Sequence, residues 1–425
     1  MKFIIQPSKI SGNLEIPPSK SHSLRAILFA LLGEGKTTIH KYLQSPDAIA
    51  MIEAIKLFGA EVEMFPDRLE IQGVGPELGP PEDVIDSGNS GQVLRFMGAL
   101  AALVPSYTVI TGDHSIRHNR PVKPLLSALS QLGVFAESMR LDGYAPIIIK
   151  GPMRGGTTSL HGGDSQPVSG LIIASAFAKK TTEICVHHPG EKPWIDLTLH
   201  WLDFLKIPYK NYRYERYRIP GNSHYKGFNY TVPADFSSLA FPLAAALVTQ
   251  SEVTLENIDM EDVQGDKKLL EALFEMGANL STEKRSIHVK KGSALKGKKL
   301  DINDYIDAIT ILAVLGCFAE GETEICNAAI ARKKESDRIH AITTELKKMG
   351  ADIEEKKEGL IVRHSKLKGA HLESYHDHRI AMSLSVAALG AEGESTIHGV
   401  ECTHKTYPTF AQDLQKLGAN IKVES

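Results

Sequence analysis

Residues 323–351 carry two short markers, Thr323-Glu324-Ile325 and Met349-Gly350-Ala351. The first is typical of a strand that follows a turn, and the second of a helix that ends at a glycine. Both recur at intervals of about seventy residues, which indicates one supersecondary unit copied six times. The strand marker recurs at Thr37-Thr38-Ile39, Thr108-Val109-Ile110, Thr182-Glu183-Ile184, Val253-Thr254-Leu255 and Ser395-Thr396-Ile397. The helix marker recurs at Leu57-Phe58-Gly59-Ala60, Leu132-Gly133-Val134, Met276-Gly277-Ala278 and Leu417-Gly418-Ala419, with a degenerate copy at Leu205-Lys206-Ile207.

Each copy reads as a strand, a polar loop, an apolar helix, a second strand, a second helix and one or two short strands. The first helix of the first copy is predicted from Leu24, Ile27, Leu28 and Leu31, which share one helix face, and it is expected to end at Gly33. Residues 239–248, 308–318 and 380–389 are apolar on every side, as buried helices are. We therefore expect helices at the centre of each lobe.

The chain is long enough for more than one core. With 425 residues and 42% hydrophobic content, six copies favour two lobes of three copies each. We expect one lobe at 18–230 and the other at 231–425 together with 1–17. The strand predicted at 2–7 would belong to the second lobe.

Charge and composition exclude several classes of protein. The net charge is −3, with 48 basic and 51 acidic residues, so the chain lacks the global field of a nucleic-acid binder. It has no long apolar run that could cross a membrane and no leader-like start. Its four cysteines have neither metal-ligand spacing nor the density of a secreted scaffold. We expect a cytoplasmic protein whose partners are small molecules rather than nucleic acid or membrane.

Residues 30–37 resemble a phosphate-binding P-loop because they end in Gly35-Lys36-Thr37. A P-loop joins a strand to the start of a helix, whereas here a predicted helix comes first and a strand-like segment follows. Sister copies of the same turn, at 319–323 and 391–395, lack the lysine. We therefore reject a P-loop nucleotide kinase.

Polar residues cluster where the first helix of each copy should begin. Helix starts carry unpaired N–H groups, so such residues either cap the helix or cradle an anion. Capping suffices for Asp235 with Ser237 and Ser238, whereas Lys20, Ser21 and Arg25 supply more cationic donors than a cap needs. The six clusters are Lys20-Ser21 with Arg25, Gly88-Asn89-Ser90-Gly91, Asp164-Ser165-Gln166, Asp235 to Ser238, Asp304 with Asp307, and His376-Asp377-His378-Arg379.

Further cations lie in segments predicted as loops, before Pro121 and at 332–338. A solvated charged face is an equally good reading of the second run on composition alone. His376 and His378 could suggest a metal site, but no third ligand has suitable spacing, and we expect no metal.

The chain resembles the 5-enolpyruvylshikimate-3-phosphate synthase family over nearly its whole length. The resemblance rests on motifs that occur in order, of which the Lys-Glu-Ser-Asp-Arg and Asp-His-Arg motifs are the most specific. The motifs are Ser19-Lys20-Ser21 with Arg25, Gly88 to Gly91 with Arg95, Arg120-Pro121, Ser165-Gln166, Lys192-Pro193, Gln264-Gly265-Asp266, Asp307-Ala308, Lys334 to Arg338, Asp377 to Arg379 and Lys405-Thr406.

The resemblance implies a two-domain inside-out α/β barrel, with three βαβαββ repeats per domain and the active site in the interdomain cleft. It implies transfer of the enolpyruvyl group of phosphoenolpyruvate to the 5-hydroxyl of shikimate 3-phosphate, with release of phosphate through a tetrahedral intermediate, in aromatic amino-acid biosynthesis. No cofactor is implied, and we expect a monomer.

The family pattern also implies roles for individual residues. Those expected to bind shikimate 3-phosphate are Lys20, Ser21, Arg25, Ser165, Gln166, Asp307 and Lys334. Those expected to bind phosphoenolpyruvate are Lys20, Gly91, Arg120, Gln166, Arg338, Arg379 and Lys405. Asp307 would be the base for the 5-hydroxyl, while Glu335, with Lys20 as helper, would handle the proton at the methylene carbon.

The sequence departs from the family pattern at four positions. Gln92 stands where a threonine is usual, Phe96 replaces a proline or leucine, and Asp164 and Glu191 stand where serines are usual. Acids beside a phosphate repel it unless they are turned away or paired. We therefore leave Asp164 and Glu191 out of the expected binding set.

Two alternative functions remain open at this stage. One is the sister enolpyruvyl transferase that acts on UDP-N-acetylglucosamine, although that family carries a cysteine in the loop before Pro121 and the first cysteine here is Cys185. The other is a non-catalytic phosphoanion-binding protein on the same scaffold. Retention of Asp307 and Glu335 argues against the second alternative.

Overall fold

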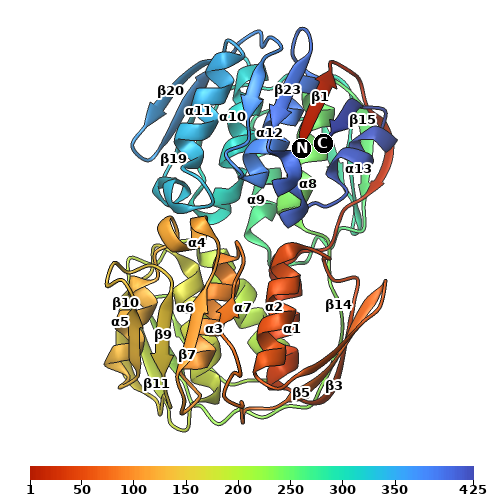
Figure 1. The fold of residues 1–425 in the computed structure, drawn as a ribbon. Coiled ribbons are helices and arrows are strands. Elements are labelled where there is room, and N and C mark those ends of the chain that lie inside the picture. Colours follow the sequence, from red (N-terminus) through yellow and green to blue (C-terminus); the bar gives the residue numbers. More distant parts are fainter. The chain divides into compact units, whose positions relative to one another are not determined.

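The computed structural model describes residues 1–425 and contains two compact units, residues 20–232 and residues 1–19 with 233–425 (Figure 1). The limits expected for the first lobe, 18–230, differ from 20–232 by two residues at each end. Strand β1 (Lys2–Gln6) pairs antiparallel with β23 (Ser395–His398) and β24 (Asn420–Glu424), so the first strand completes a sheet built by the last repeat.

Unit 20–232 contains three four-stranded sheets. In spatial order, the first sheet is β14 (Asn229–Thr231), β3 (Glu34–His40), β5 (Arg68–Val74) and β4 (Glu61–Met64). The second is β6 (Ile85–Asp86), β7 (Thr108–Thr111), β9 (Ile147–Lys150) and β8 (Phe135–Ser138). The third is β10 (Gly156–His161), β11 (Thr182–His187), β13 (Arg216–Ile219) and β12 (Lys210–Tyr212).

The other unit also contains three four-stranded sheets. The first is β2 (Ser11–Glu15), β15 (Glu252–Glu256), β17 (Ser286–Val289) and β16 (Leu280–Thr282). The second is β18 (Lys299–Asp301), β19 (Glu322–Cys326), β21 (Gly359–Arg363) and β20 (Asp352–Lys356). The third is β22 (His371–Glu373), β23, β1 and β24.

All six sheets share one pairing pattern, which confirms the six-repeat prediction. The strand that carries the strand marker pairs in parallel with the first strand of its sheet and antiparallel with the third, as in β7 with β6 and β9. A parallel pair requires a crossover, and in four of the sheets the first helix of the repeat provides it. In three of the sheets one strand comes from another part of the chain: β14, β2 and β1.

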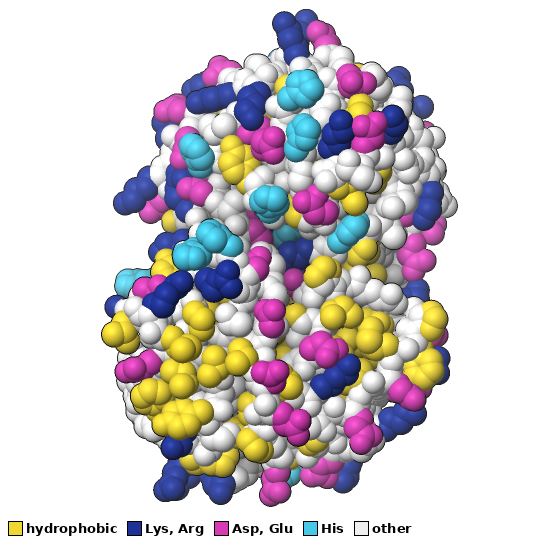
Figure 2. All heavy atoms as spheres, viewed as in Figure 1, with side chains coloured by type: hydrophobic (Ala, Val, Ile, Leu, Met, Phe, Trp, Pro, Cys, Tyr) yellow, Lys and Arg dark blue, Asp and Glu magenta, His cyan; other side chains and the backbone are white.

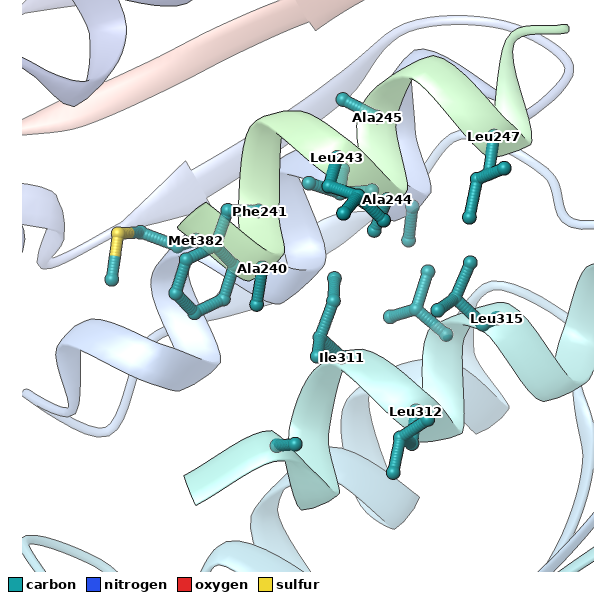
Figure 3. Close-up of a cluster of buried hydrophobic side chains, with 14 of the residues drawn as sticks. Ala240, Phe241, Leu243, Ala244, Ala245, Leu247, Ile311, Leu312, Leu315 and Met382 are labelled. Carbon is teal, nitrogen blue, oxygen red and sulfur yellow. The ribbon is translucent and has the colours of Figure 1, made fainter. Parts of the chain in front are cut away.

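The first helices of the repeats are buried almost throughout, as their apolar sequences predict. Figure 3 shows side chains of three such helices from one unit packing against each other, with Leu247 of one helix opposite Leu315 of the next. The helix expected to end at Gly33 ends one residue earlier, at Leu32, and the predicted ends at Val248, Phe318 and Leu389 are confirmed. The six helices are α1 (Lys20–Leu32), α3 (Gly91–Ala101), α6 (Ser165–Phe177), α8 (Phe236–Val248), α10 (Ile309–Phe318) and α12 (His378–Leu389).

The second helices all end in the same type of C-cap. In the copy at 349–351, the N–H of Gly350 donates to the carbonyl of Lys347 and the N–H of Ala351 donates to the carbonyl of Leu346. This is the Schellman pattern, in which the residue after the cap takes a positive φ. The six helices are α2 (Pro46–Leu57), α5 (Lys123–Gln131), α7 (Lys192–Phe204), α9 (Lys268–Glu275), α11 (Arg338–Lys348) and α13 (Phe410–Lys416).

Short helical segments precede several of these elements. They are α4 (His114–His118) and the 3-10 helices η1 (Gly265–Lys267), η2 (Asn303–Ala308), η3 (Ala329–Lys333) and η4 (Val400–Lys405). The segment Gly35-Lys36-Thr37 lies inside β3 and directly follows α1, which confirms that it is not a P-loop. No helix is both long and apolar enough to span a membrane.

Figure 2 shows that hydrophobic side chains are frequent on the visible surface of unit 20–232. Exposed examples in this unit include Tyr107, Phe135, Met139 and Leu141. On the same face the other unit shows acidic, basic and histidine side chains side by side. This mixture of signs agrees with the small net charge of −3.

The third repeat offers a test of the C-cap. Lys206 adopts φ 57° at the position where the other five repeats have glycine, and a residue with a Cβ is strained there. We expect Lys206→Gly to raise the free energy of unfolding by about 0.5–1 kcal/mol, because relief of this strain exceeds the extra chain entropy of glycine. Urea unfolding measures the change.

The matched control is Gly133→Ala in the second repeat, where φ is 79° and an added Cβ would meet no atom within 4 Å. We expect it to lower stability by a similar amount, since only the backbone conformation opposes it. Equal stabilities for Lys206→Gly and the parent would contradict this account of the cap.

Candidate active site

Arg25 is a buried cation whose hydrogen bonds all go to neutral oxygens. Its side chain lies on α1, donates to Thr198 Oγ1 at 2.9 and 3.1 Å, and also donates to the carbonyls of Ser21 and Trp194. The guanidinium carbon lies 5.1 Å from the ring centre of Phe96 on α3. Burial lowers the pKa of Arg25, because desolvation disfavours its charge. An anionic ligand would relieve this penalty.

Residues expected to bind phosphoenolpyruvate converge at the start of α3. Arg95 Nη1 donates to Gln166 Oε1 at 2.8 Å and to the carbonyl of Gly91 at 3.3 Å. A Cβ added to Gly91 would lie 3.2 Å from Gln166 Oε1 and 3.7 Å from Arg120 Nη1. Gly91, Gln166 and Arg120 are thus brought together, and the absence of a side chain at Gly91 leaves room among them.

Lys20 lies at the first position of α1 and pairs with Asp47 near the start of α2. Lys20 Nζ is 3.4 Å from Asp47 Oδ2, which also accepts a hydrogen bond from Ser90 Oγ at 3.1 Å. Asp47 is buried, so it holds the ammonium group of Lys20 close to the start of α3, where Ser90 is the N-cap.

The two acids that depart from the family pattern are both paired. Asp164 is the N-cap of α6, accepts from the N–H of Gln166 at 3.0 Å, and forms an ion pair with Arg95 at 3.1 Å. Glu191 Oε2 accepts from the N–H and from the Oγ–H of Ser165, both at 3.0 Å. The donors at the start of α6 are therefore engaged by carboxylates of the chain.

In the other unit, Arg338 lies at the centre of a buried ionic network. It is 1% exposed and donates to Asp377 at 2.8 and 3.2 Å, to Asp307 Oδ1 at 2.7 Å and to Glu335 Oε2 at 2.7 Å. Asp377 is the N-cap of α12, and Asp337 is the N-cap of α11, the helix that Arg338 begins. Two adjacent helix starts therefore fix this arginine.

Two more cations complete the network. Arg379 Nη2 donates to Asp307 Oδ2 at 2.8 Å and to Ser237 Oγ at 3.0 Å. Lys405 Nζ lies 2.8 Å from Glu335 Oε1. Asp307 and Glu335 therefore each bridge two cations, and Arg338 is common to both.

The network sets the protonation of its members. Burial opposes the charge of Asp307, but Arg379, Arg338 and Lys334 outweigh burial and hold the pKa of Asp307 well below its usual range. Burial likewise acts to lower the pKa of Arg338, yet Asp377, Glu335 and Asp307 raise it overall. Asp307 is thus ionised at neutral pH and, in this arrangement, a weak base.

Asp266 is a second buried carboxyl group in the same unit. Burial and the negative charge of Asp307 raise its pKa to about 8, although Arg379 acts in the opposite direction. Asp266 is therefore largely protonated at neutral pH, beside an ionised Asp307. Such a pair of acids in opposite protonation states is characteristic of sites that move protons.

The histidines of the Asp-His-Arg segment lie in different environments. The side chain of His376 is 86% exposed, whereas that of His378 is 1% exposed. The structure contains no group of three or more His, Cys, Asp or Glu side chains that could hold a metal ion.

The structure thus distributes the expected site residues over two clusters. Lys20, Ser21, Arg25, Gly91, Arg120, Ser165 and Gln166 belong to unit 20–232, and Asp307, Lys334, Glu335, Arg338, Arg379 and Lys405 to the other unit. The expectation that Asp235 caps a helix is confirmed, because its carboxylate accepts from the N–H of Ser238.

Several residues of these clusters were not assigned a role from the sequence. Asp377 and Arg95 lie inside motifs of the family resemblance, so their neighbours indicate that they lie near the site. The sequence does not show which charged groups they pair with. Asp47 and Thr198 gave no signal, since one reads as an ordinary residue of a first helical turn and the other as a helix-interior threonine.

A six-repeat α/β fold that places buried arginines and carboxylates at helix starts is suited to a protein that binds multiply charged anions. Comparison with known proteins specifies it further. The family model for EPSP synthase (3-phosphoshikimate 1-carboxyvinyltransferase) matches residues 4–414. The chain is 45% identical over 421 residues to the 3-phosphoshikimate 1-carboxyvinyltransferase of Acetivibrio thermocellus, covering 99% of both proteins. It is 41% identical over 427 residues to that of Methanocaldococcus jannaschii, again covering 99% of both.

The fold agrees with these matches. A solved structure of EPSP synthase from Acinetobacter baumannii aligns with a TM-score of 0.86 and 30% identity, covering 100% of both chains. The chain therefore belongs to the EPSP synthase family. It is an enzyme that transfers the enolpyruvyl group of phosphoenolpyruvate to shikimate 3-phosphate, in the shikimate pathway of aromatic amino-acid biosynthesis. The alternative acceptor UDP-N-acetylglucosamine is not favoured.

The protonation of Asp266 leads to a prediction about stability. Because its pKa is higher in the folded protein than in the unfolded chain, the folded protein holds a proton that the unfolded chain releases between about pH 4 and pH 8. The free energy of unfolding of the parent should fall across this window by up to about 1.4 kcal/mol per pH unit from this group. Asp266→Asn removes that dependence, so its stability relative to the parent should rise from pH 5 to pH 7.

Urea unfolding at pH 5, 6 and 7 measures this difference. Asp304→Asn is the control, because Asp304 contacts the solvent-accessible Lys268 and lies outside the network. A constant difference between Asp266→Asn and the parent at all three pH values would rule out a protonated Asp266.

Proposed function

We propose that the two clusters supply the binding and catalytic groups of the enolpyruvyl transfer, in the roles that the family resemblance implies. The observation that carries the proposal is that Asp307 accepts hydrogen bonds from both Arg338 and Arg379, one on each carboxylate oxygen. Two arginines that bind one carboxylate in this way have the geometry to bind a substrate anion instead.

Phosphoenolpyruvate carries a carboxylate and a phosphate, and the phosphate alone brings about −1.5 to −2 charges at neutral pH. Arginine forks bind both groups bidentately, while lysine acts as a point charge. We assign to this substrate the residues Lys20, Gly91, Arg120, Gln166, Arg338, Arg379 and Lys405. Gly91 has the role of leaving space, because an added Cβ would lie 2.7 Å from Arg95 Nη1 and 3.2 Å from Gln166 Oε1.

Substrate binding would also activate Asp307. When the anionic groups of phosphoenolpyruvate engage Arg338 and Arg379, Asp307 shares or loses the cations that hold its pKa low. Its pKa then rises, and it becomes a better base. We propose that Asp307 removes the proton of the 5-hydroxyl as that oxygen attacks the central carbon of phosphoenolpyruvate.

The rest of the reaction moves a second proton. The methylene carbon gains a proton when the tetrahedral intermediate forms, and it loses one when phosphate leaves. We assign this proton to Glu335 with Lys20 as helper. Glu335 is suited to the task because Lys405 and Arg338 hold its two carboxylate oxygens in a fixed orientation.

Shikimate 3-phosphate also carries a carboxylate and a phosphate. We assign to it the residues Lys20, Ser21, Arg25, Ser165, Gln166, Asp307 and Lys334. Arg25 is the strongest of these assignments, since its buried charge is surrounded by neutral oxygens and an aromatic ring, and an anion would offset its desolvation.

We further propose that the enzyme works as a monomer in the cytoplasm on these small molecules. The four cysteines are free thiols, and burial raises the pKa of Cys317 and of Cys402 to about 12. Unreactive buried thiols suit a reducing compartment. Light scattering after size-exclusion chromatography measures the oligomeric state.

Asp307→Asn should lower kcat by about 10²–10⁴-fold, because the amide cannot accept the proton of the 5-hydroxyl. Calorimetric binding of shikimate 3-phosphate should change much less. Asp304→Asn, three residues earlier in η2, is the matched control and should retain activity. A kcat of Asp307→Asn close to that of the parent would remove Asp307 as the base.

Arg120→Ala should raise KM for phosphoenolpyruvate by about tenfold or more, because a charge-assisted bidentate contact is lost. KM for shikimate 3-phosphate should change little. Arg117→Ala is the control, since Arg117 instead donates to the carbonyl of Gly112. If both variants saturate with phosphoenolpyruvate as the parent does, Arg120 does not bind that substrate.

A further inference from the structure

The first two N–H groups of α6 are bound by side chains of the chain itself. Glu191 Oε2 accepts from the N–H and Oγ–H of Ser165, and Asp164 Oδ1 accepts from the N–H of Gln166. Ser165 and Gln166 are also residues that we assign to shikimate 3-phosphate. The same donors therefore have two potential acceptors, one internal and one in the substrate.

The position of Glu191 follows from the sheet beneath it. Strands β10 and β11 are parallel neighbours with His161 opposite His187, so they end together and the loops that lead to α6 and α7 lie side by side. The N–H of Gly190 donates to the carbonyl of Gly162 at 3.0 Å, which ties the two loops together. Glu191 thereby reaches across from one loop to the helix that begins after the other.

Glu191 is placed as an internal ligand rather than as a cap of its own helix. It stands at the N-cap position of α7, yet its side chain makes no capping hydrogen bond there and instead binds Ser165. The residue is 1% exposed, and its backbone is left-handed, with φ 47°. A buried carboxylate on a strained backbone points to a functional constraint.

We propose that Glu191 determines affinity and specificity in the shikimate 3-phosphate site, because its carboxylate competes with the phosphate of the substrate for the donors of Ser165. This proposal depends on the assignment of Ser165 made under Proposed function. The two anions repel each other, and Glu191 Oε2 already accepts from both the N–H and the O–H of this residue. Phosphate therefore binds to Ser165 only when the Glu191 carboxylate moves away.

Competition from Glu191 favours binding of shikimate 3-phosphate over binding of inorganic phosphate. Inorganic phosphate gains only its own contacts when it displaces Glu191, whereas shikimate 3-phosphate adds contacts to Lys20, Ser21 and Arg25. Since the reaction releases inorganic phosphate, Glu191 would keep that product from occupying the acceptor site. The internal carboxylate thus raises the discrimination between the substrate and free phosphate.

The test compares inhibition by inorganic phosphate in the parent and in Glu191→Gln. The amide keeps the size of the side chain but is a weaker acceptor and carries no charge. We expect inorganic phosphate, competing with shikimate 3-phosphate, to show an inhibition constant at least tenfold lower in Glu191→Gln. KM for shikimate 3-phosphate should also fall, and kcat should stay within about twofold, as the reacting groups are unchanged.

Two further variants support this comparison. Glu191→Gly removes the side chain and suits the positive φ, so it should fold and show the same gain in phosphate affinity. Glu183→Gln, on β11, makes the same change of charge at a solvent-accessible site that faces Arg218, and should behave as the parent does. An unchanged or higher inhibition constant in both Glu191 variants would overturn the proposal.

Ser165→Ala separates this proposal from the assignment on which it depends. If Ser165→Ala added to Glu191→Gly, where no internal carboxylate competes for the donors, leaves the affinity for shikimate 3-phosphate unchanged in calorimetry, the assignment of the Ser165 hydroxyl is wrong, and the competition is excluded with it. If Ser165→Ala weakens that binding while the Glu191 variants gain no affinity for phosphate, Ser165 binds the substrate and only the competition is wrong.

Discussion

Both charged clusters depend on the pairing of buried guanidinium groups with acceptors that the chain itself supplies. A buried charge is strongly destabilising when it is left alone, so Arg338 and Arg95 are held by Asp307, Glu335, Asp377 and Asp164. Arg25 is the exception, because its hydrogen bonds go only to neutral oxygens. On the proposed assignments, substrate anions replace internal carboxylates in one place and add a missing charge in another.

The proposed exchange would let carboxylates that are weak bases in the free protein serve the reaction. In the absence of substrate, the arginines hold the pKa of Asp307 far below neutrality, which protects the fold from an unpaired buried carboxylate. Binding of phosphoenolpyruvate would redirect those arginines, so that basicity develops only when the substrate is present. The proposed role of Glu191 is similar: its carboxylate accepts the hydrogen bonds of Ser165 at the start of α6 until shikimate 3-phosphate displaces it.

The repeat architecture provides the positions for these groups. Each first helix is buried along its length, so its polar start is the one place where it can present donors without disturbing the apolar core. The repeats differ in what they place there: Asp164, Asp235 and Asp377 cap their helices, whereas α1 begins with the cation Lys20. The repeats thus differ in the polar and charged residues at the starts of their first helices. The Schellman caps at the ends of their second helices are nearly uniform.

The sequence by itself determined the ends of the buried helices and the capping role of Asp235, because these depend on residues within one or two helical turns of each other. It also determined the six repeats, because each local marker recurs at a regular interval along the chain. It also placed the site residues in motifs through the family resemblance. Only the tertiary structure decided which polar and charged groups meet: Glu191 binds Ser165 across 26 residues, Arg338 binds Asp377 across 39, and Arg25 binds Thr198 across 173. Such partners depend on which loops the parallel strands and packed helices place side by side, and no local pattern records that arrangement.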